Sequence, residues 1–204
     1  MTEYIIHEKI IREVIGTAIP KPVGDNTDVI IPGRHLMEIT FRKMGDYVYA
    51  DERSIDGQPV PGHPFNDPRY SGANILIAGA NYGSGSSRQH APEALHRFGI
   101  DAIIAESFAE IFAGNCKNIG LVAVTVPSNY IVELADYVQQ KPCTKFDINL
   151  DKKKIEYDGN VTEFNIPEGR RQAFLTGTWD AMAVLQKGES RIKKVEKILP
   201  YLYF

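Results

Sequence analysis

One stretch determines both the fold and the candidate site: Gly79-Ala80-Asn81-Tyr82-Gly83-Ser84-Gly85-Ser86-Ser87-Arg88-Gln89-His90. An apolar run at 74–78 precedes it and a helical pattern at 89–98 follows it, which predicts a strand, a glycine-rich turn and the start of a helix. Such a turn directs free N–H groups and the positive end of a helix dipole outward, where anions bind. Glycine lets the backbone approach a ligand closely, and the planar guanidinium of Arg88 suits a carboxylate or a phosphate.

The chain after residue 71 alternates between short apolar runs and helical patterns. This order predicts a parallel sheet segment with right-handed crossovers. Gly99 should end the first of these helices, and Ser107 and Ser128 should cap the next two. The predicted strands and helices are, in order, 75–78, 92–98, 102–105, 108–115, 121–126 and 130–139.

Beyond residue 142 apolar and polar residues alternate with a period of two. This predicts an antiparallel meander, in which Asp158-Gly159 forms a hairpin turn. We therefore expect an α/β fold whose domain covers 1–186 and whose C-terminal helical extension covers 187–204. The strands of the meander are predicted at 145–150, 154–157 and 160–166, and two further helices at 167–175 and 178–185.

The N-terminal part of the chain is less regular. Residues 12–19 are rich in β-branched side chains and predict one strand, which Pro20 should stop. Residues 24–32 predict a polar turn that leads into a short apolar strand. Asp28 in this turn either satisfies local backbone groups or directs its carboxylate into a site.

Residues 33–70 form an irregular segment directly before the central stretch. Residues 33–38 fit a short helical turn and residues 47–50 fit a strand. Four prolines between residues 54 and 68 predict a loop. Because a long loop beside a glycine-rich motif is usually functional, we expect this segment to lie over the site.

The composition is that of an ordinary globular protein, with 43% hydrophobic residues and a formal net charge of −3 over 204 residues. This charge gives no reason to expect nucleic acid or an anionic membrane as a partner. No apolar run approaches the ~20 residues that span a bilayer, and the N-terminus has no signal pattern. We expect a cytoplasmic protein.

Potential metal ligands are few and scattered. Cys116 and Cys143 are too few for a structural zinc site or a self-contained iron–sulfur cluster, so we interpret both as ordinary thiols. His35, His63 and His96 are isolated and are interpreted as surface or loop residues. We expect no metal site on this chain.

The stretch 79–90 differs from other well-known loops. It has neither the GxxxxGK[ST] pattern of a phosphate loop nor a clean GxGxxG dinucleotide pattern. The GxSxG pattern of a serine nucleophile is absent as well, because the centre of Gly83-Ser84-Gly85-Ser86-Ser87 is a glycine. A non-catalytic module that binds an anion or a nucleotide stays open as an alternative.

Four blocks of the sequence resemble, in order, the swivelling domain of the aconitase superfamily. Residues 81–91 resemble its glycine- and serine-rich signature, and Asn26-Thr27-Asp28-Val29-Ile30-Ile31-Pro32 resembles its acidic block. As a free-standing chain, the sequence is similar to the small subunits of 3-isopropylmalate dehydratases from about residue 14 to residue 186. The other two blocks are 107–112 and 115–121.

The resemblance implies a three-layer β/β/α swivelling domain that closes over a large subunit in a hetero-oligomer. That large subunit would carry a [4Fe-4S] cluster, while this chain would bind no cofactor. The implied reaction isomerises 2-isopropylmalate and 3-isopropylmalate, which are small dicarboxylates, by dehydration and rehydration in leucine biosynthesis. Related hydro-lyases that act on homoaconitate, citramalate or dimethylmalate are alternatives within the same class.

The resemblance also implies roles for individual residues. Ser86 would be the general base, and Ser87 and Arg88 would bind a substrate carboxylate. Asp28 matches an acidic position that helps to arrange the site. The residues that would support the turn are Asn81, Gly83, Gly85 and His90, and those that would form a specificity loop are Arg34, His35, Leu36 and Met37.

Two positions depart from what the resemblance implies. Gln89 stands where the superfamily usually has glutamate, so a negative charge beside Arg88 is missing. Glu38 is an acidic residue in a segment that would have to meet an apolar isopropyl group. The sequence therefore leaves the side group of the substrate open.

Overall fold

Two four-stranded sheets form the centre of the molecule. The structure, a computed structural model, describes residues 9–37, 41–86, 88–188, 194–197 and 199. One sheet is parallel and the other is antiparallel. The parallel sheet has the order β2 (Ala18–Lys21), β5 (Ile75–Ala78), β6 (Ala102–Ala105) and β7 (Val122–Thr125). The antiparallel sheet has the order β1 (Glu13–Gly16), β8 (Phe146–Asn149), β9 (Lys154–Tyr157) and β10 (Asn160–Glu163).

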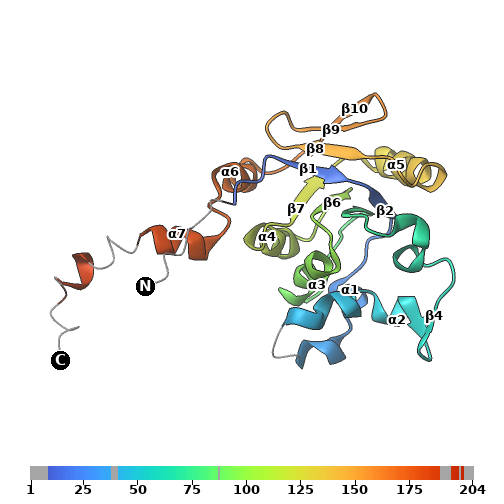
Figure 1. The fold of residues 1–204 in the computed structure, drawn as a ribbon, viewed down its shortest axis with the longest axis horizontal. Coiled ribbons are helices and arrows are strands. Elements are labelled where there is room, and N and C mark those ends of the chain that lie inside the picture. Colours follow the sequence, from blue (N-terminus) through green and yellow to red (C-terminus); the bar gives the residue numbers. More distant parts are fainter. Residues whose placement is uncertain (1–8, 38–40, 87, 189–193, 198, 200–204) are drawn as a thin grey trace.

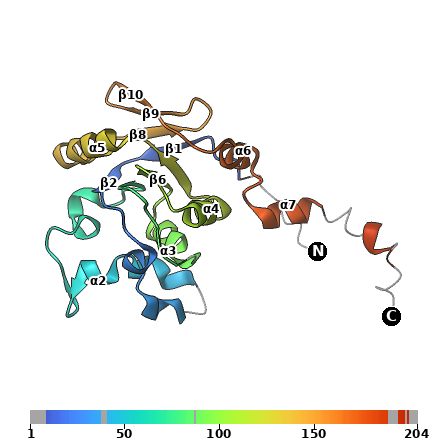
Figure 2. The ribbon, with the colours of Figure 1, turned by 180° about the vertical axis from the view of Figure 1, so that it is seen from behind.

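The sheets and helices form three layers, which Figures 1 and 2 show from opposite sides. The antiparallel sheet lies over one face of the parallel sheet. Helices α3 (His90–Phe98) and α4 (Glu110–Asn118) lie on the other face, and α5 (Ser128–Gln140) packs against β2 and β5. The predicted β/β/α arrangement is confirmed.

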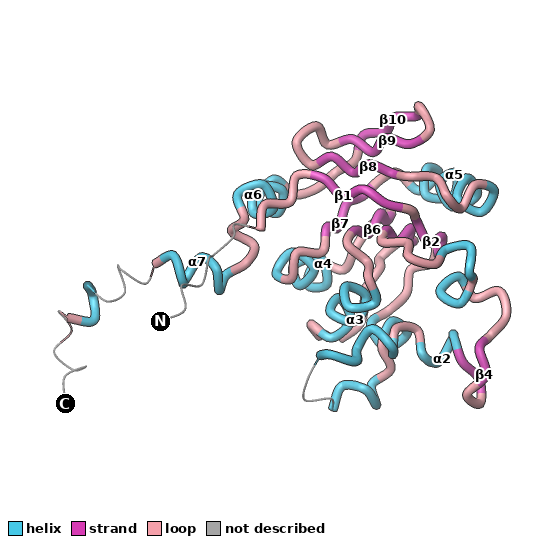
Figure 3. The backbone as a smooth tube through the Cα atoms, viewed as in Figure 1, coloured by secondary structure: helices cyan, strands magenta, loops and turns pink. Residues whose placement is uncertain are grey.

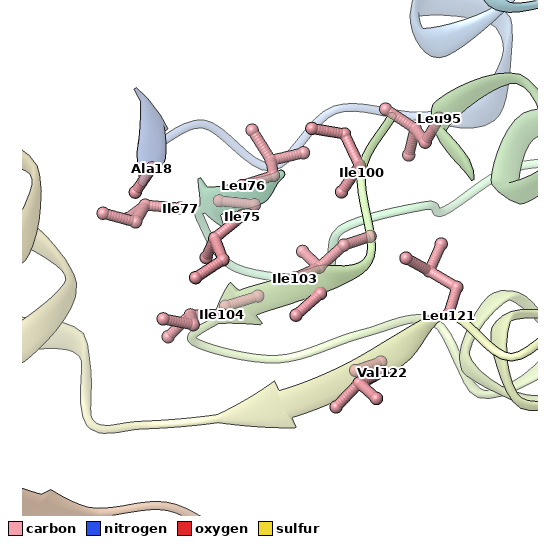
Figure 4. Packing of buried hydrophobic residues seen from close by; sticks show 14 of the residues in the cluster. Ala18, Ile75, Leu76, Ile77, Leu95, Ile100, Ile103, Ile104, Leu121 and Val122 are labelled. Carbon is pink, nitrogen blue, oxygen red and sulfur yellow. The ribbon is translucent and has the colours of Figure 1, made fainter. Parts of the chain in front are cut away.

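The parallel sheet is buried because its strands are apolar on both faces. Every residue of β5 and β6 is buried, as expected for a parallel sheet that is covered on both sides. Figure 4 shows the side chains of these strands packed with Leu95, Ile100 and Leu121.

No helix in the described part of the chain is long and apolar enough to cross a membrane.

Most elements predicted after residue 71 are confirmed, including α6 (Glu168–Thr176) and α7 (Ala181–Lys187). Gly99 ends α3 with a φ of 116°. Asp158 and Gly159 form the predicted hairpin turn between β9 and β10, with φ values of 42° and 80°. α7 crosses the predicted boundary at residue 186, and most of the predicted extension lies outside the described residues.

The two predicted serine caps are wrong. α4 begins at Glu110, so Ser107 lies too far upstream to cap it. Its hydroxyl instead accepts a hydrogen bond of 2.8 Å from the backbone N–H of Asn81. α5 begins at Ser128 itself, and its N-cap position is Pro127.

The predicted single strand at 12–19 is also wrong. The chain changes sheets at Thr17, because the Thr17 carbonyl accepts hydrogen bonds from the backbone N–H groups of Asn74 and Ile75. Residues before Thr17 form β1, and residues after it form β2. Pro20 does not stop β2 but lies inside it, which an edge strand tolerates because its outer N–H groups need no partner strand.

Two further predicted strands are short helices. The predicted strand that follows the turn at 24–32 is replaced by α1 (Thr27–Ile30), because the Asn26 side chain accepts hydrogen bonds of 2.9 Å from two backbone N–H groups of its first turn. The predicted strand at 47–50 is interrupted by Tyr49, whose φ is 54°, and α2 (Ala50–Arg53) follows.

Residues 33–70 contain short helical turns and one small hairpin (Figure 3). The elements are η1 (Gly33–Met37), η2 (Phe41–Tyr47), β3 (Ser54–Ile55), β4 (Gln58–Pro59), η3 (Pro64–Asn66) and η4 (Pro68–Tyr70). The beginning of the segment lies beside the candidate site, where a Cβ on Gly33 would lie 3.9 Å from Arg88 Nη1. Of the later turns, η2 packs against α3 and η3 against β2. That the segment lies over the site stays a prediction.

A close backbone crossing connects the end of β5 to the segment before α1. The N–H of Gly79 donates to the carbonyl of Val23 at 2.9 Å. A Cβ on Gly24 would lie 1.9 Å from the carbonyl oxygen of Ala80, and a Cβ on Gly79 would lie 2.7 Å from the carbonyl carbon of Val23. Both glycines are therefore required by the close approach of the two segments.

We expect Gly24→Ala to lower the free energy of unfolding by about 1–3 kcal/mol, because the added methyl group overpacks the crossing. Gly114→Ala is the matched control. An added Cβ at Gly114, inside α4, meets no atom within 4 Å, so this variant should be about 0.5–1 kcal/mol more stable. Urea unfolding of both variants measures the difference, and equal stabilities would contradict the close crossing.

Candidate active site

The glycine-rich turn is held on one side by the segment that leads into α1. The N–H of Gly83 donates to the Asp25 carbonyl at 2.8 Å, and the N–H of Thr27 donates to the Ser84 carbonyl at 2.8 Å. The Thr27 hydroxyl donates to the Ser86 carbonyl at 3.2 Å. Since Thr27 is buried, these bonds are shielded from water and fix the backbone up to Ser86.

The opposite side of the turn is held by the segment between β6 and α4. The N–H of Tyr82 donates to the Ser107 carbonyl at 3.0 Å, and the N–H of Ala109 donates to the Tyr82 carbonyl at 3.0 Å. Together with the bond from Asn81 to the Ser107 hydroxyl, these contacts insert the turn between two other chain segments. Asn81 and Tyr82 are consequently anchored to the segment that precedes α4.

Three of the residues predicted to support the turn have positive φ values. Asn81, Gly83 and Gly85 have φ values of 50°, 76° and 99°. Asparagine tolerates this region better than most residues, and glycine adopts it freely. Gly83 is further constrained by space, because a Cβ there would lie 2.1 Å from the Phe112 ring.

Arg88 and Asp28, which are 60 positions apart, meet at the mouth of the turn. Arg88 Nη1 lies 3.0 Å from Asp28 Oδ1. The single contact leaves the other guanidinium N–H groups able to bind a further anion. Asp28 lies in the first turn of α1, where a negative charge is favoured by the helix dipole. The structure thus brings together two of the predicted site residues.

Ser86 and Arg88 line a pocket of ≈ 200 Å³ between the turn and the start of α4. Ile111 and Asn115 of α4 line the opposite wall. The first N–H groups of a helix have no partner within the helix, so this end of α4 adds donors and a positive dipole to the pocket. No described residue forms a hydrogen bond with the Ser86 hydroxyl.

An acidic residue at the edge of the pocket is neutralised by a partner. Glu110, the first residue of α4, forms an ion pair with Arg170 of α6. Arg170 offsets the charge of this carboxylate, so Glu110 does not cancel the donors and the dipole of the helix end.

A buried polar cluster lies beneath the turn. Lys21 and Asp25 are only 7% and 5% exposed, and their charged groups lie 2.6 Å apart. Lys21 Nζ also lies 3.1 Å from Glu52 Oε2 and 4.4 Å from the ring centre of Tyr49. The hydroxyls of Tyr49 and Tyr82 are 2.6 Å apart, and burial raises the pKa of both well above the ordinary value.

The predicted specificity residues are spread over different contacts. Arg34 forms a two-nitrogen ion pair with Asp51, and the hydrogen bond to Arg34 lowers the pKa of that carboxyl. His35 stacks on Tyr47 with ring centres 3.9 Å apart. Leu36 is half-buried against the core, and Met37 is 87% exposed.

The remaining predicted site residues lie at the start of α3 or outside the described chain. His90 Nδ1 is buried without a hydrogen-bond partner among the described residues, and its ring packs against Phe41 at 5.4 Å. Gln89 Nε2 donates to Glu93 Oε1 at 3.4 Å. Ser87 lies outside the described residues, as does Glu38.

Several residues at the site were not singled out from the sequence. Thr27, Ile111 and Asn115 line the pocket, and Lys21 and Asp25 form the cluster beneath it. Asn26, followed by Thr27 and Asp28, is a capping signal for the start of α1. The sequence could therefore have indicated Thr27. The pairing of Lys21 with Asp25 has no such signal, because Lys21 is the last residue of β2 and Asp25 lies in the irregular segment that follows.

A second pocket of ≈ 470 Å³ lies at the other end of α3. Arg53, Phe65, Tyr70 and Phe98 are among its lining residues. Arg53 is committed to the fold, since it donates to Asn66 Oδ1 at 3.1 Å and to the Val48 carbonyl at 3.2 Å. None of the predicted site residues that the structure describes lines this pocket.

We expect Lys21→Met to lower the free energy of unfolding by about 3–5 kcal/mol, because Asp25 would be left as an unpaired buried charge. The double variant Lys21→Met/Asp25→Asn should recover part of this loss, since it removes that charge. Lys141→Met, in an exposed ion pair with Asp158, is the control and should change stability little. If urea unfolding gave Lys21→Met the same free energy of unfolding as Lys141→Met, this would show that the cluster does not support the turn.

Comparisons with known proteins identify relatives of this chain. Residues 34–129 match the Aconitase C-terminal domain family. The chain is 40% identical over 188 residues to a 3-isopropylmalate dehydratase small subunit of Thermus thermophilus, covering 91% of this chain and 93% of the relative. It is 37% identical over 196 residues to the corresponding subunit of a Synechocystis species, covering 95% and 96%.

A solved structure of 3-isopropylmalate dehydratase from Methanocaldococcus jannaschii is similar in fold. It aligns with a TM-score of 0.67 and 26% sequence identity, covering 89% of this chain and 98% of that one. The resemblance seen in the four sequence blocks is thereby confirmed over nearly the whole length of the relatives. The chain belongs to the family of 3-isopropylmalate dehydratase small subunits, in the aconitase superfamily.

Proposed function

We propose that this chain is the small subunit of a hydro-lyase that interconverts 2-isopropylmalate and 3-isopropylmalate together with a large subunit. The observation that carries the proposal is the joint position of Ser86 and Arg88 in one pocket at the free end of α4. A generic anion-binding loop needs N–H groups and a cation. It does not need a serine hydroxyl beside them.

The substrate's carboxylates match the positive character of this pocket. Arg88 would bind one carboxylate through the N–H groups that Asp28 leaves available. Asp28 would keep the guanidinium turned toward the pocket mouth. Ser87, which the family resemblance assigns to the same carboxylate, completes the proposed binding group.

Ser86 is proposed to take the proton from the substrate carbon next to a carboxylate. A free serine is a very weak base, so its alkoxide needs strong electrostatic stabilisation. The N–H groups at the start of α4 and the Arg88 guanidinium would supply it once closure against a partner excludes water. Hydroxide would leave the adjacent carbon as the double bond forms. For the isomer to form, hydroxide would then add to the carbon that lost the proton, and the Ser86 hydroxyl would return its proton to the carbon that lost the hydroxide.

The cysteines of this chain do not fit an iron–sulfur cluster. Cys116 is buried in the core, where burial raises the pKa of its thiol, and Cys143 is exposed. A cluster needs several thiolates around one position. If the reaction uses the family's [4Fe-4S] cluster, the large subunit must therefore supply its ligands.

We expect the isolated chain to be inactive and the mixture with an anaerobically prepared large subunit to isomerise 2-isopropylmalate. Ser86→Ala should lower kcat by about 10²–10⁴-fold, the usual contribution of a general base, while assembly stays intact. Ser71→Ala, at an exposed turn away from the pocket, is the matched control. Steady-state kinetics and size-exclusion chromatography measure the two effects.

Full activity of Ser86→Ala would disprove the assignment of the base. A preference of the wild-type complex for homoaconitate, citramalate or dimethylmalate would move the chain to a related hydro-lyase. Tight nucleotide binding without any dicarboxylate turnover would favour the non-catalytic module instead.

A further inference from the structure

Ile111 is an exposed apolar residue at the lip of the proposed active site. It lies in the first turn of α4, its side chain is 57% exposed, and it lines the same pocket as Ser86 and Arg88. Single exposed apolar residues are common on protein surfaces. Ile111, however, lies beside a pocket whose other walls carry the Arg88 guanidinium, the hydroxyls of Thr27 and Ser86, and the Asn115 amide.

Among the described residues that line the pocket, Ile111 has the most exposed apolar side chain. Phe112 also lines the pocket but is only 2% exposed, because its ring packs under Gly83. Ala109 contributes one methyl group. Thr27, Glu110 and Asn115 are the polar residues of the wall besides Ser86 and Arg88. A ligand with one branched alkyl group and two carboxylates therefore finds one strong apolar contact here.

The segment expected to select the substrate is less suited to this contact. Arg34 is held by Asp51 and His35 by the Tyr47 ring. Leu36 is half-buried against the core. Met37 is exposed, but it is not among the residues that line the pocket.

We propose that Ile111 is a specificity-determining residue that contacts the branched alkyl group of the substrate. This inference rests on the proposed function. Arg88 and Ser86 act on the carboxylate and the carbon next to it, so the alkyl group must lie against another wall of the pocket. A hydrophobic contact that distinguishes one or more methylene groups typically changes kcat/KM by 10–200-fold.

The test compares two substrates in the complex with the large subunit. We expect Ile111→Ala to lower the ratio of kcat/KM for 2-isopropylmalate to kcat/KM for its methyl analogue, citramalate, by at least about tenfold. Ile111→Leu should restore most of the ratio. Val132→Ala, at a residue of α5 with 56% exposure, is the matched control. If an analogue is not turned over, its inhibition constant is measured in place of its kcat/KM.

An equal effect of Ile111→Ala on both substrates would overturn the inference. A loss of subunit assembly in this variant would overturn it too, because Ile111 would then be a docking residue. If Met37→Ala lowered the ratio of the two kcat/KM values and Ile111→Ala did not, substrate selection would be assigned to the predicted specificity loop. Inactivity of the wild-type complex toward both substrates would instead contradict the proposed function.

Discussion

The buried ion pair between Lys21 and Asp25 is the interaction on which the site depends. Removing two charges from water costs several kcal/mol per ion unless each finds close partners. Lys21 has three such partners: the Asp25 carboxylate, the Glu52 carboxylate and the face of the Tyr49 ring. Asp25 in turn holds the N–H of Gly83 through its backbone carbonyl. The charge cluster and the glycine-rich turn are therefore connected through Asp25.

In the site, neighbouring segments hold the backbone, whereas the side chains of Ser86 and Arg88 keep hydrogen-bonding groups available. The glycine-rich turn is fixed by two neighbouring segments, whereas the Ser86 hydroxyl has no described hydrogen-bond partner and Arg88 uses one nitrogen for Asp28. This division suits a group that must change protonation state inside a preorganised field.

The central β-α-β-α-β unit could be predicted from sequence because each strand is a continuous apolar run and each helix has a clear period. Gly99 and the Asp158-Gly159 turn are signals of the same local kind. The errors fall where tertiary contacts decide. Asn26 turns an apolar run into a helix by capping it, and Ser107 satisfies a distant backbone donor. Of the candidate site, Ser86, Arg88 and Asp28 were identifiable, but Lys21 and Asp25 meet only in the folded chain.

Pro20 has a consequence for how this protein can associate. It removes a backbone donor from β2, the edge strand of the parallel sheet. At the opposite edge, Thr125 of β7 exchanges two backbone hydrogen bonds with Asn165, of 2.9 and 2.8 Å. Both margins of the sheet are thus poor templates for adding a foreign strand. A subunit that waits for its partner is thereby protected against edge-to-edge aggregation, and recognition is left to side chains.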